Sequence, residues 1–115
     1  MKLKEIKEIV EKVRNDFEQQ NIDYNLLGRL YNEYEPMKGL DSFINTSRKI
    51  FPHLNCGLTT VYLKSILKQG EIVNGKYENQ NHTFLKIEDL IIDITADQFN
   101  GSKVYVGKMK KPWSS

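Results

Sequence analysis

The chain contains few of the residues that mark particular classes of protein. It has one cysteine, three prolines and one tryptophan among 115 residues. A single cysteine excludes an internal disulfide framework. No apolar run approaches the roughly 20 residues that a membrane-spanning helix needs, and interleaved charges after Met1 exclude a secretory signal with an apolar middle. We therefore expect a cytoplasmic protein with a reduced thiol and no membrane partner.

An excess of charge of one sign is also lacking. Seventeen Lys and Arg against fifteen Asp and Glu give a formal charge of +2, which does not indicate nucleic-acid binding. With 39% hydrophobic and 28% charged residues, the composition is that of a globular protein. The length predicts one domain over residues 1–115. We expect a helical part over 1–50, a helix plus a sheet over 51–107, and a solvated basic tail over 108–115.

The first half of the chain has the periodicity of amphipathic helices. From Leu3 to about Gln19, apolar residues recur every three or four positions, with Lys, Glu and Arg on the opposite face. Asn21 or Asp23 is a candidate cap for a second helix, which Pro36 ends. Its tyrosines, at positions 24, 31 and 34, fall at roughly helical spacing and are expected to pack in the core or line a groove.

Two further helices are expected before the middle of the chain. Asp41 is a candidate cap for a helix from Ser42 to about Ile50. Another should run from Cys56 to about Gln69, with Gly70 as its stop. This fourth helix has a wide apolar face, which predicts a central and largely buried position.

Residues after 70 have the character of strands and turns. Strands are expected at residues 71–73, 82–88, 90–95 and 103–106. Asn74-Gly75 and Asn100-Gly101 are turn signals, and Glu88-Asp89 is expected to form a solvated turn. Helices followed by strands predict an α+β domain with a small antiparallel sheet.

Cys56 is the candidate nucleophile. A cysteine at a helix N-terminus lies near unpaired backbone amides, whose partial positive charge favours the thiolate. The same amides can stabilise the oxyanion that forms when a carbonyl is attacked. Asn55 could cap the helix or donate to that oxyanion. Gly57 would let a substrate approach the backbone closely.

His82 and Asp93 are the candidate base and orienting acid. If a hairpin turns at Glu88-Asp89, Phe84 faces Asp93 and His82 faces Thr95. Because side chains alternate across a strand, His82 and Asp93 then project from one face as diagonal neighbours. A carboxylate there would fix the tautomer of the imidazole and stabilise its charged form.

This arrangement resembles the papain-like superfamily in its transglutaminase-like order of Cys, His and Asp. His82-Thr83-Phe84-Leu85 resembles the His-x-aromatic pattern of bacterial members, and the segment around Asp93 resembles their Asp-bearing strand; the resemblance covers about residues 50–107. It implies a papain-like fold whose cysteine-bearing helix packs on the sheet, with Cys56 as nucleophile, His82 as general base and Asp93 as orienting acid. It also implies a peptide or protein substrate and no cofactor. Members include peptidases, amidases, deamidases and acyl transferases.

Two features depart from that resemblance. Phe84 stands where many relatives have Trp, and no upstream glutamine is clearly placed to form an oxyanion hole. Gln98, just after the strand that carries Asp93, is the candidate to line the site, whereas Gln19 and Gln20 are expected to be solvated.

Alternative interpretations start from the same residues. A papain-like scaffold could be a non-catalytic binding or regulatory module, or an effector-like deamidase that acts on a folded protein. His53, three residues before Cys56, could join Cys56, His82 and Asp93 in a tetrahedral metal site, but a lone cysteine makes a loop position the preferred interpretation for His53.

Overall fold

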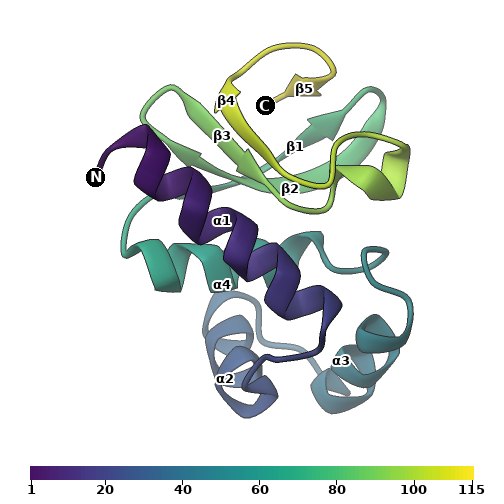
Figure 1. Cartoon of the computed structure of the whole chain (residues 1–115). Helices are drawn as coiled ribbons and strands as arrows, with labels where there is room; N and C mark the ends of the chain where they lie inside the picture. The colour runs from purple at the N-terminus through teal and green to yellow at the C-terminus, as the bar shows by residue number, and fades with distance from the viewer.

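Four α-helices precede five strands along the chain, as Figure 1 shows for the computed structural model, which describes residues 1–115. The helices are α1 (Leu3–Glu18), α2 (Tyr24–Tyr34), α3 (Leu40–Lys49) and α4 (Cys56–Leu67). The strands are β1 (Glu71–Tyr77), β2 (Gln80–Ile87), β3 (Leu90–Asp93), β4 (Tyr105–Lys108) and β5 (Trp113–Ser114), and a 3-10 helix, η1 (Ala96–Phe99), follows β3. The predicted α+β class is confirmed. None of the helices combines the length and the apolar content needed to cross a membrane.

The strands form one antiparallel sheet in the order β4-β3-β2-β1-β5. The sheet curls into half a barrel. In the β2–β3 hairpin, Ile87 pairs with Leu90 and Leu85 pairs with Ile92. This register confirms the predicted turn at Glu88-Asp89.

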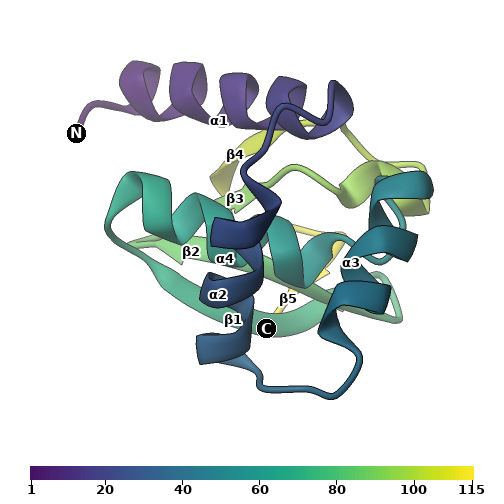
Figure 2. The same cartoon turned by 90° about the horizontal axis from the view of Figure 1, so that it is seen from below.

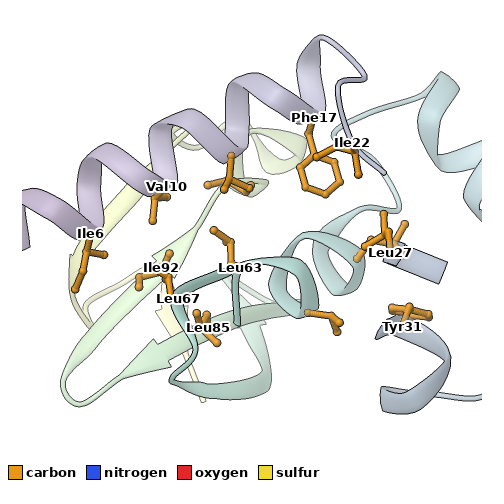
Figure 3. Close-up of a cluster of buried hydrophobic side chains, with 14 of the residues drawn as sticks. Ile6, Val10, Phe17, Ile22, Leu27, Tyr31, Leu63, Leu67, Leu85 and Ile92 are labelled. Carbon is orange, nitrogen blue, oxygen red and sulfur yellow. The ribbon is translucent and has the colours of Figure 1, made fainter. Parts of the chain in front are cut away.

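Helices α1 and α4 cover one face of the sheet. Helix α4 contacts β2 and β1, and α1 lies beside β3 and β4 (Figure 2). Figure 3 shows Val10 of α1 pointing toward Ile92 of β3, with Leu63 of α4 beside them. These three side chains are fully buried, and burying each one stabilises the fold by about 1.5–3 kcal/mol. The core therefore fixes α4, and with it residue 56, against the middle of the sheet.

A second, smaller cluster lies apart from this main core. It consists of Tyr77, Phe84, Ile91, Ala96 and Trp113. Phe84 projects into this cluster while its neighbour Leu85 projects into the main core, as the alternation of side chains along a strand requires. Both faces of β2 are therefore buried in its middle, which explains why two large apolar residues, Phe84 and Leu85, follow each other in the sequence.

The predicted helix boundaries need two corrections. Asp23 caps α2, since its carboxylate accepts from the backbone N–H groups of Asn25 and Leu26, but Asp41 does not cap α3. Gly39 takes the N-cap position with a φ of +70°, and Asp41 lies in the first turn. Helix α4 also ends earlier than expected, because Lys68 adopts the left-handed conformation that was expected of Gly70.

Asn74-Gly75 was predicted as a turn, and this prediction is wrong. Both residues lie within β1, where Gly75 pairs with His82, and the turn comes three residues later. Gly75 is needed for a different reason. A Cβ atom there would collide with the carbonyl oxygen of Ser114, because the C-terminal segment crosses β1 at this point. Glycine within a strand often marks such a close approach of another backbone.

The prediction of a solvated basic tail over 108–115 is also wrong in part. Lys108 belongs to β4, and Trp113 and Ser114 form β5, which pairs with Tyr77 and Lys76 of β1. The physical reason is the indole of Trp113, which is buried and stacks against Tyr105 at a centroid distance of 4.1 Å. This apolar burial holds the segment on the sheet despite its lysines.

Arg14 was expected on the solvated face of the first helix, but it is buried. Its guanidinium forms a bidentate pair with Asp97 of η1 at 2.7 and 2.8 Å and donates to the carbonyl oxygen of Ile94 at 2.7 Å. The planar guanidinium has several N–H donors in a fixed geometry, so it can bind a carboxylate and nearby carbonyl oxygens at the same time. Arg14 therefore ties α1 to the segment that follows β3.

Candidate active site

Cys56 is the first residue of α4, and its side chain is partly buried. It borders a pocket of about 320 Å³ that is otherwise lined by Asn74, Gly75, Asn81, His82 and Thr83. The predicted start of the fourth helix is thus confirmed, and the thiol lies at the junction of α4, β1 and β2. The lining is mostly polar and carries no acidic side chain.

Thr60 links the first turn of α4 to β2. Its hydroxyl oxygen lies 2.6 Å from the carbonyl oxygen of Cys56 and 3.3 Å from that of Thr83. This side-chain bridge positions the start of the helix beside the strand that carries His82.

His82 and Asp93 form a buried hydrogen bond. The Nε2 atom of His82 lies 2.6 Å from Oδ2 of Asp93, and the two side chains are 0% and 1% exposed. The diagonal placement expected from the hairpin register is therefore what the structure contains. Because Nε2 faces Asp93, only the other ring nitrogen, Nδ1, remains for a further partner.

Three further donors reach the carboxylate of Asp93. The indole N–H of Trp113 donates to Oδ2 at 2.8 Å, and the backbone N–H of Thr95 donates to Oδ1 at 2.9 Å. The Thr95 hydroxyl lies 3.4 Å from the same Oδ1 atom. A buried carboxylate is costly unless it is paired and hydrogen-bonded. These donors, together with His82, meet that requirement.

Aromatic rings enclose the imidazole of His82. The ring of Phe99 meets it edge-on at a centroid distance of 5.1 Å, and Tyr77 does so at 6.2 Å. Phe84 approaches from the same strand at 6.1 Å. Excluding water in this way strengthens the interaction of the ring with Asp93.

The site raises the pKa of His82 to about 9. Burial favours the neutral ring, but the hydrogen bond to Asp93 and the charges of Asp93 and Cys56 outweigh it. The pKa of the Cys56 thiol is lowered, although burial opposes this, because the nearby imidazole of His82 and the backbone of Thr83 stabilise the thiolate. These shifts favour a thiolate–imidazolium pair.

The structure places the three predicted accessory residues differently. Gln98 comes near the site, with Nε2 at 3.5 Å from Nδ1 of His82. Asn55 occupies the N-cap position, but its amide donates to the carbonyl oxygens of Ser47 and His53 at 3.0 and 2.7 Å and does not cap the helix. The expectation that this side chain caps α4 is therefore wrong, and both of its amide protons are engaged by backbone carbonyls.

Gly57 faces away from the space where a substrate was expected. A Cβ atom at this position would lie 3.1 Å from the ring of Tyr31. The absence of a side chain therefore serves the packing of α4 against α2. His53 is exposed in the turn before α4, and no metal-binding group of His, Cys, Asp and Glu side chains forms.

Trp113, Thr95 and Phe99 are site residues that the sequence analysis did not identify. Trp113 is the only tryptophan in the chain, which was the one available signal. Its position in a lysine-rich segment favoured a tail, and nothing local to the segment indicates pairing with a strand 36 residues earlier.

Replacing Trp113 with Phe should lower the free energy of unfolding by at least about 2 kcal/mol, because a buried hydrogen bond to a charged group is lost and the phenyl ring fills less of the space of the indole. Urea denaturation followed by circular dichroism measures this change. Tyr105→Phe, which removes a hydroxyl bonded to the exposed carbonyl of Lys108, is the matched control and should have a much smaller effect. Equal stability of Trp113→Phe and wild type would show that the indole N–H does not support Asp93.

No protein-family model, curated protein or solved structure matches this chain.

Proposed function

We propose that this protein is a cysteine-dependent hydrolase or acyltransferase with a papain-like, transglutaminase-like core, which attacks an amide or thioester carbonyl through Cys56. The observation that carries the proposal is the buried 2.6 Å hydrogen bond between His82 and Asp93 next to a thiol whose pKa is lowered. A nucleophile, a base and a group that orients the base are the components of this chemistry.

In the first step, the thiolate of Cys56 attacks the carbonyl carbon of an amide, and a C–S bond forms. The carbonyl π electrons move to oxygen and give a tetrahedral oxyanion. The imidazolium of His82 then gives its Nδ1 proton to the leaving nitrogen, the C–N bond breaks, and an amine or ammonia departs. Asp93 holds the ring in place and stabilises its charge. The product on the protein is a thioester.

In the second step, His82 takes a proton from water as the water oxygen attacks the thioester carbonyl. The C–S bond breaks, the acid is released, and the thiolate–imidazolium pair is restored. An amine in place of water would complete acyl transfer by the same route. No cofactor takes part in these steps.

Oxyanion stabilisation in this scheme comes from the backbone amides at the start of α4, since the Asn55 side chain is occupied. Gln98 is the side chain that we assign to assist, because its amide lies beside the imidazole. A preorganised donor to the oxyanion contributes about 3–4 kcal/mol in well-studied acyl transfer.

The test of the nucleophile is alkylation by iodoacetamide, which reports only Cys56 because the chain has one cysteine. At pH 7 the thiol should react faster than free cysteine, since a lowered pKa gives a larger thiolate fraction. Mass spectrometry of the intact protein gives the rate, and Cys56→Ala should remain folded and unlabelled. A rate no faster than that of free cysteine would refute an activated thiol.

The alternative function, a non-catalytic binding module, is favoured by one observation. The His82 side chain has no exposed surface, whereas deacylation requires water to reach Nδ1. p-Nitrophenyl acetate separates the two functions. An enzyme releases p-nitrophenolate in a burst followed by turnover, whereas a module reacts once at most.

A further inference from the structure

A second hollow, of about 460 Å³, lies between α2, α4 and β1. Its apolar lining consists of Leu30 and Tyr34 from α2, Val61 from α4 and Ile72 from β1. Val61 is buried, and the other three side chains are partly exposed. A concave apolar lining of this size suits one apolar side chain of a ligand.

This hollow adjoins the Cys56 pocket. Tyr34 lines the hollow and Asn74 lines the pocket, and the tyrosine hydroxyl lies 3.1 Å from the amide nitrogen of Asn74 and 3.2 Å from its amide oxygen. One pair of hydrogen-bonded side chains thus separates the two spaces. Since Ile72 and Asn74 are two residues apart on β1, their side chains share a face at a spacing of about 7 Å.

The edge of β1 beside these spaces is open. β5 pairs with this edge at Lys76 and Tyr77, and Ser114 and Ser115 lie against Gly75, so residues 71–74 have no strand on that side. Unpaired backbone groups of an edge strand are a template for another extended chain. β5 shows that this edge accepts an antiparallel segment, and Gly75 lets that backbone approach closely.

Charged side chains at the rim of the hollow give it a preference for an acidic ligand. Lys64 and Lys68 line it together with Glu33, and all three residues are exposed. The rim therefore has one net positive charge, which complements an acidic group on a ligand.

We propose that an extended peptide binds along the β1 edge, with an apolar side chain in the Leu30–Ile72 hollow and its reacting carbonyl about two residues away at Cys56. An acidic residue beside the apolar one meets Lys64 and Lys68. This inference rests on the proposed function for the reacting carbonyl, but the binding of the peptide is tested without any reaction.

The binding test uses the full chain with Cys56→Ala, labelled with ¹⁵N. The probe is the capped pentapeptide Gly-Gly-Leu-Asp-Gly, compared with Gly-Gly-Ser-Asp-Gly. Amide chemical shifts of residues 71–74 should move on titration. The serine peptide should bind at least about tenfold more weakly, because the burial of one leucine side chain is lost.

Ile72→Lys, which fills the hollow with a charge, should reduce the affinity for the leucine peptide at least about tenfold. Ile66→Lys is the matched control, since Ile66 is a 42% exposed residue of α4 that does not line the hollow, and it should bind as the parent does. Equal affinity for both peptides, or amide chemical-shift changes confined to other elements, would refute the proposal that the peptide binds along β1.

The two proposals fail in distinguishable ways. If the leucine peptide moves the β1 amides but the wild-type thiol reacts no faster than free cysteine, the groove stands and the enzymatic function is wrong. If Cys56 is reactive and the peptide does not bind at β1, the function stands and this substrate site is wrong.

Discussion

Replacing His82 with Ala should raise the pKa of the Cys56 thiol and slow its alkylation at pH 7 by at least about tenfold. The thiolate fraction falls about tenfold for each unit by which the thiol pKa rises, at a pH well below that pKa. In the wild-type protein the imidazole opposes the effect of burial on the thiol. Without the imidazole, burial raises the pKa and only the backbone and side chain of Thr83 still oppose it.

The measurement is the rate of iodoacetamide alkylation between pH 5 and 10. The wild-type rate should reach half its maximum below the ordinary thiol pKa of 9.0, and the His82→Ala profile should shift to higher pH. His53→Ala is the control, because His53 is the only other histidine and is exposed. Superimposable profiles for His82→Ala and wild type would show that the imidazole does not act on the thiol.

The rate of deacylation should rise with pH. His82 must be neutral to take a proton from water, and its pKa is raised to about 9 in the free protein. The slow release of p-nitrophenolate after the burst should therefore accelerate as pH rises through the pKa that His82 has in the acylated protein. That pKa lies below about 9, because the thioester no longer carries the negative charge of the thiolate.

Replacing Arg14 with Met should lower the free energy of unfolding by about 3 kcal/mol, since it leaves the carboxylate of Asp97 without its buried partner. The Arg14 side chain is 7% exposed and that of Asp97 is 18% exposed. Water can therefore replace few of the hydrogen bonds that the Asp97 carboxylate loses with the guanidinium. For a domain of this size, the midpoint of thermal unfolding should fall by about 10 °C.

Thermal and urea unfolding followed by circular dichroism test this expectation. Arg14→Lys keeps the charge but loses the bidentate geometry, and its stability should lie between those of wild type and Arg14→Met. Lys12→Ala is the matched control on the same helix, because it removes an exposed pair with Asp16, and its stability should stay close to wild type. A loss in Lys12→Ala as large as in Arg14→Met would show that any charge on α1 matters equally.

The hairpin that carries His82 and Asp93 could be predicted because its determinants are local. The apolar and β-branched runs on either side of Glu88-Asp89 define two strands, and a tight turn fixes their register. Once the register is known, the alternation of side chains places His82 and Asp93 on one face. The same reasoning located the start of α4 at Cys56, because the apolar periodicity begins there.

The remaining parts of the site depend on contacts that no local pattern encodes. Trp113 reaches Asp93 from 20 positions away, and Arg14 reaches Asp97 across 83 positions. Periodicity along a helix predicts that an arginine lies on the polar face. It contains no information about a carboxylate from another segment that could pair with the arginine in the interior. Asn74-Gly75 has the composition of a turn, but its glycine is used where a distant backbone crosses the strand.

That crossing makes residue 75 a point at which one methyl group would matter. Alanine there would force Ser114 away from β1, and the displacement would carry Trp113 off the carboxylate of Asp93. The absence of a side chain at the edge of the sheet is thus a condition for the hydrogen bond that Trp113 donates to the buried carboxylate of Asp93.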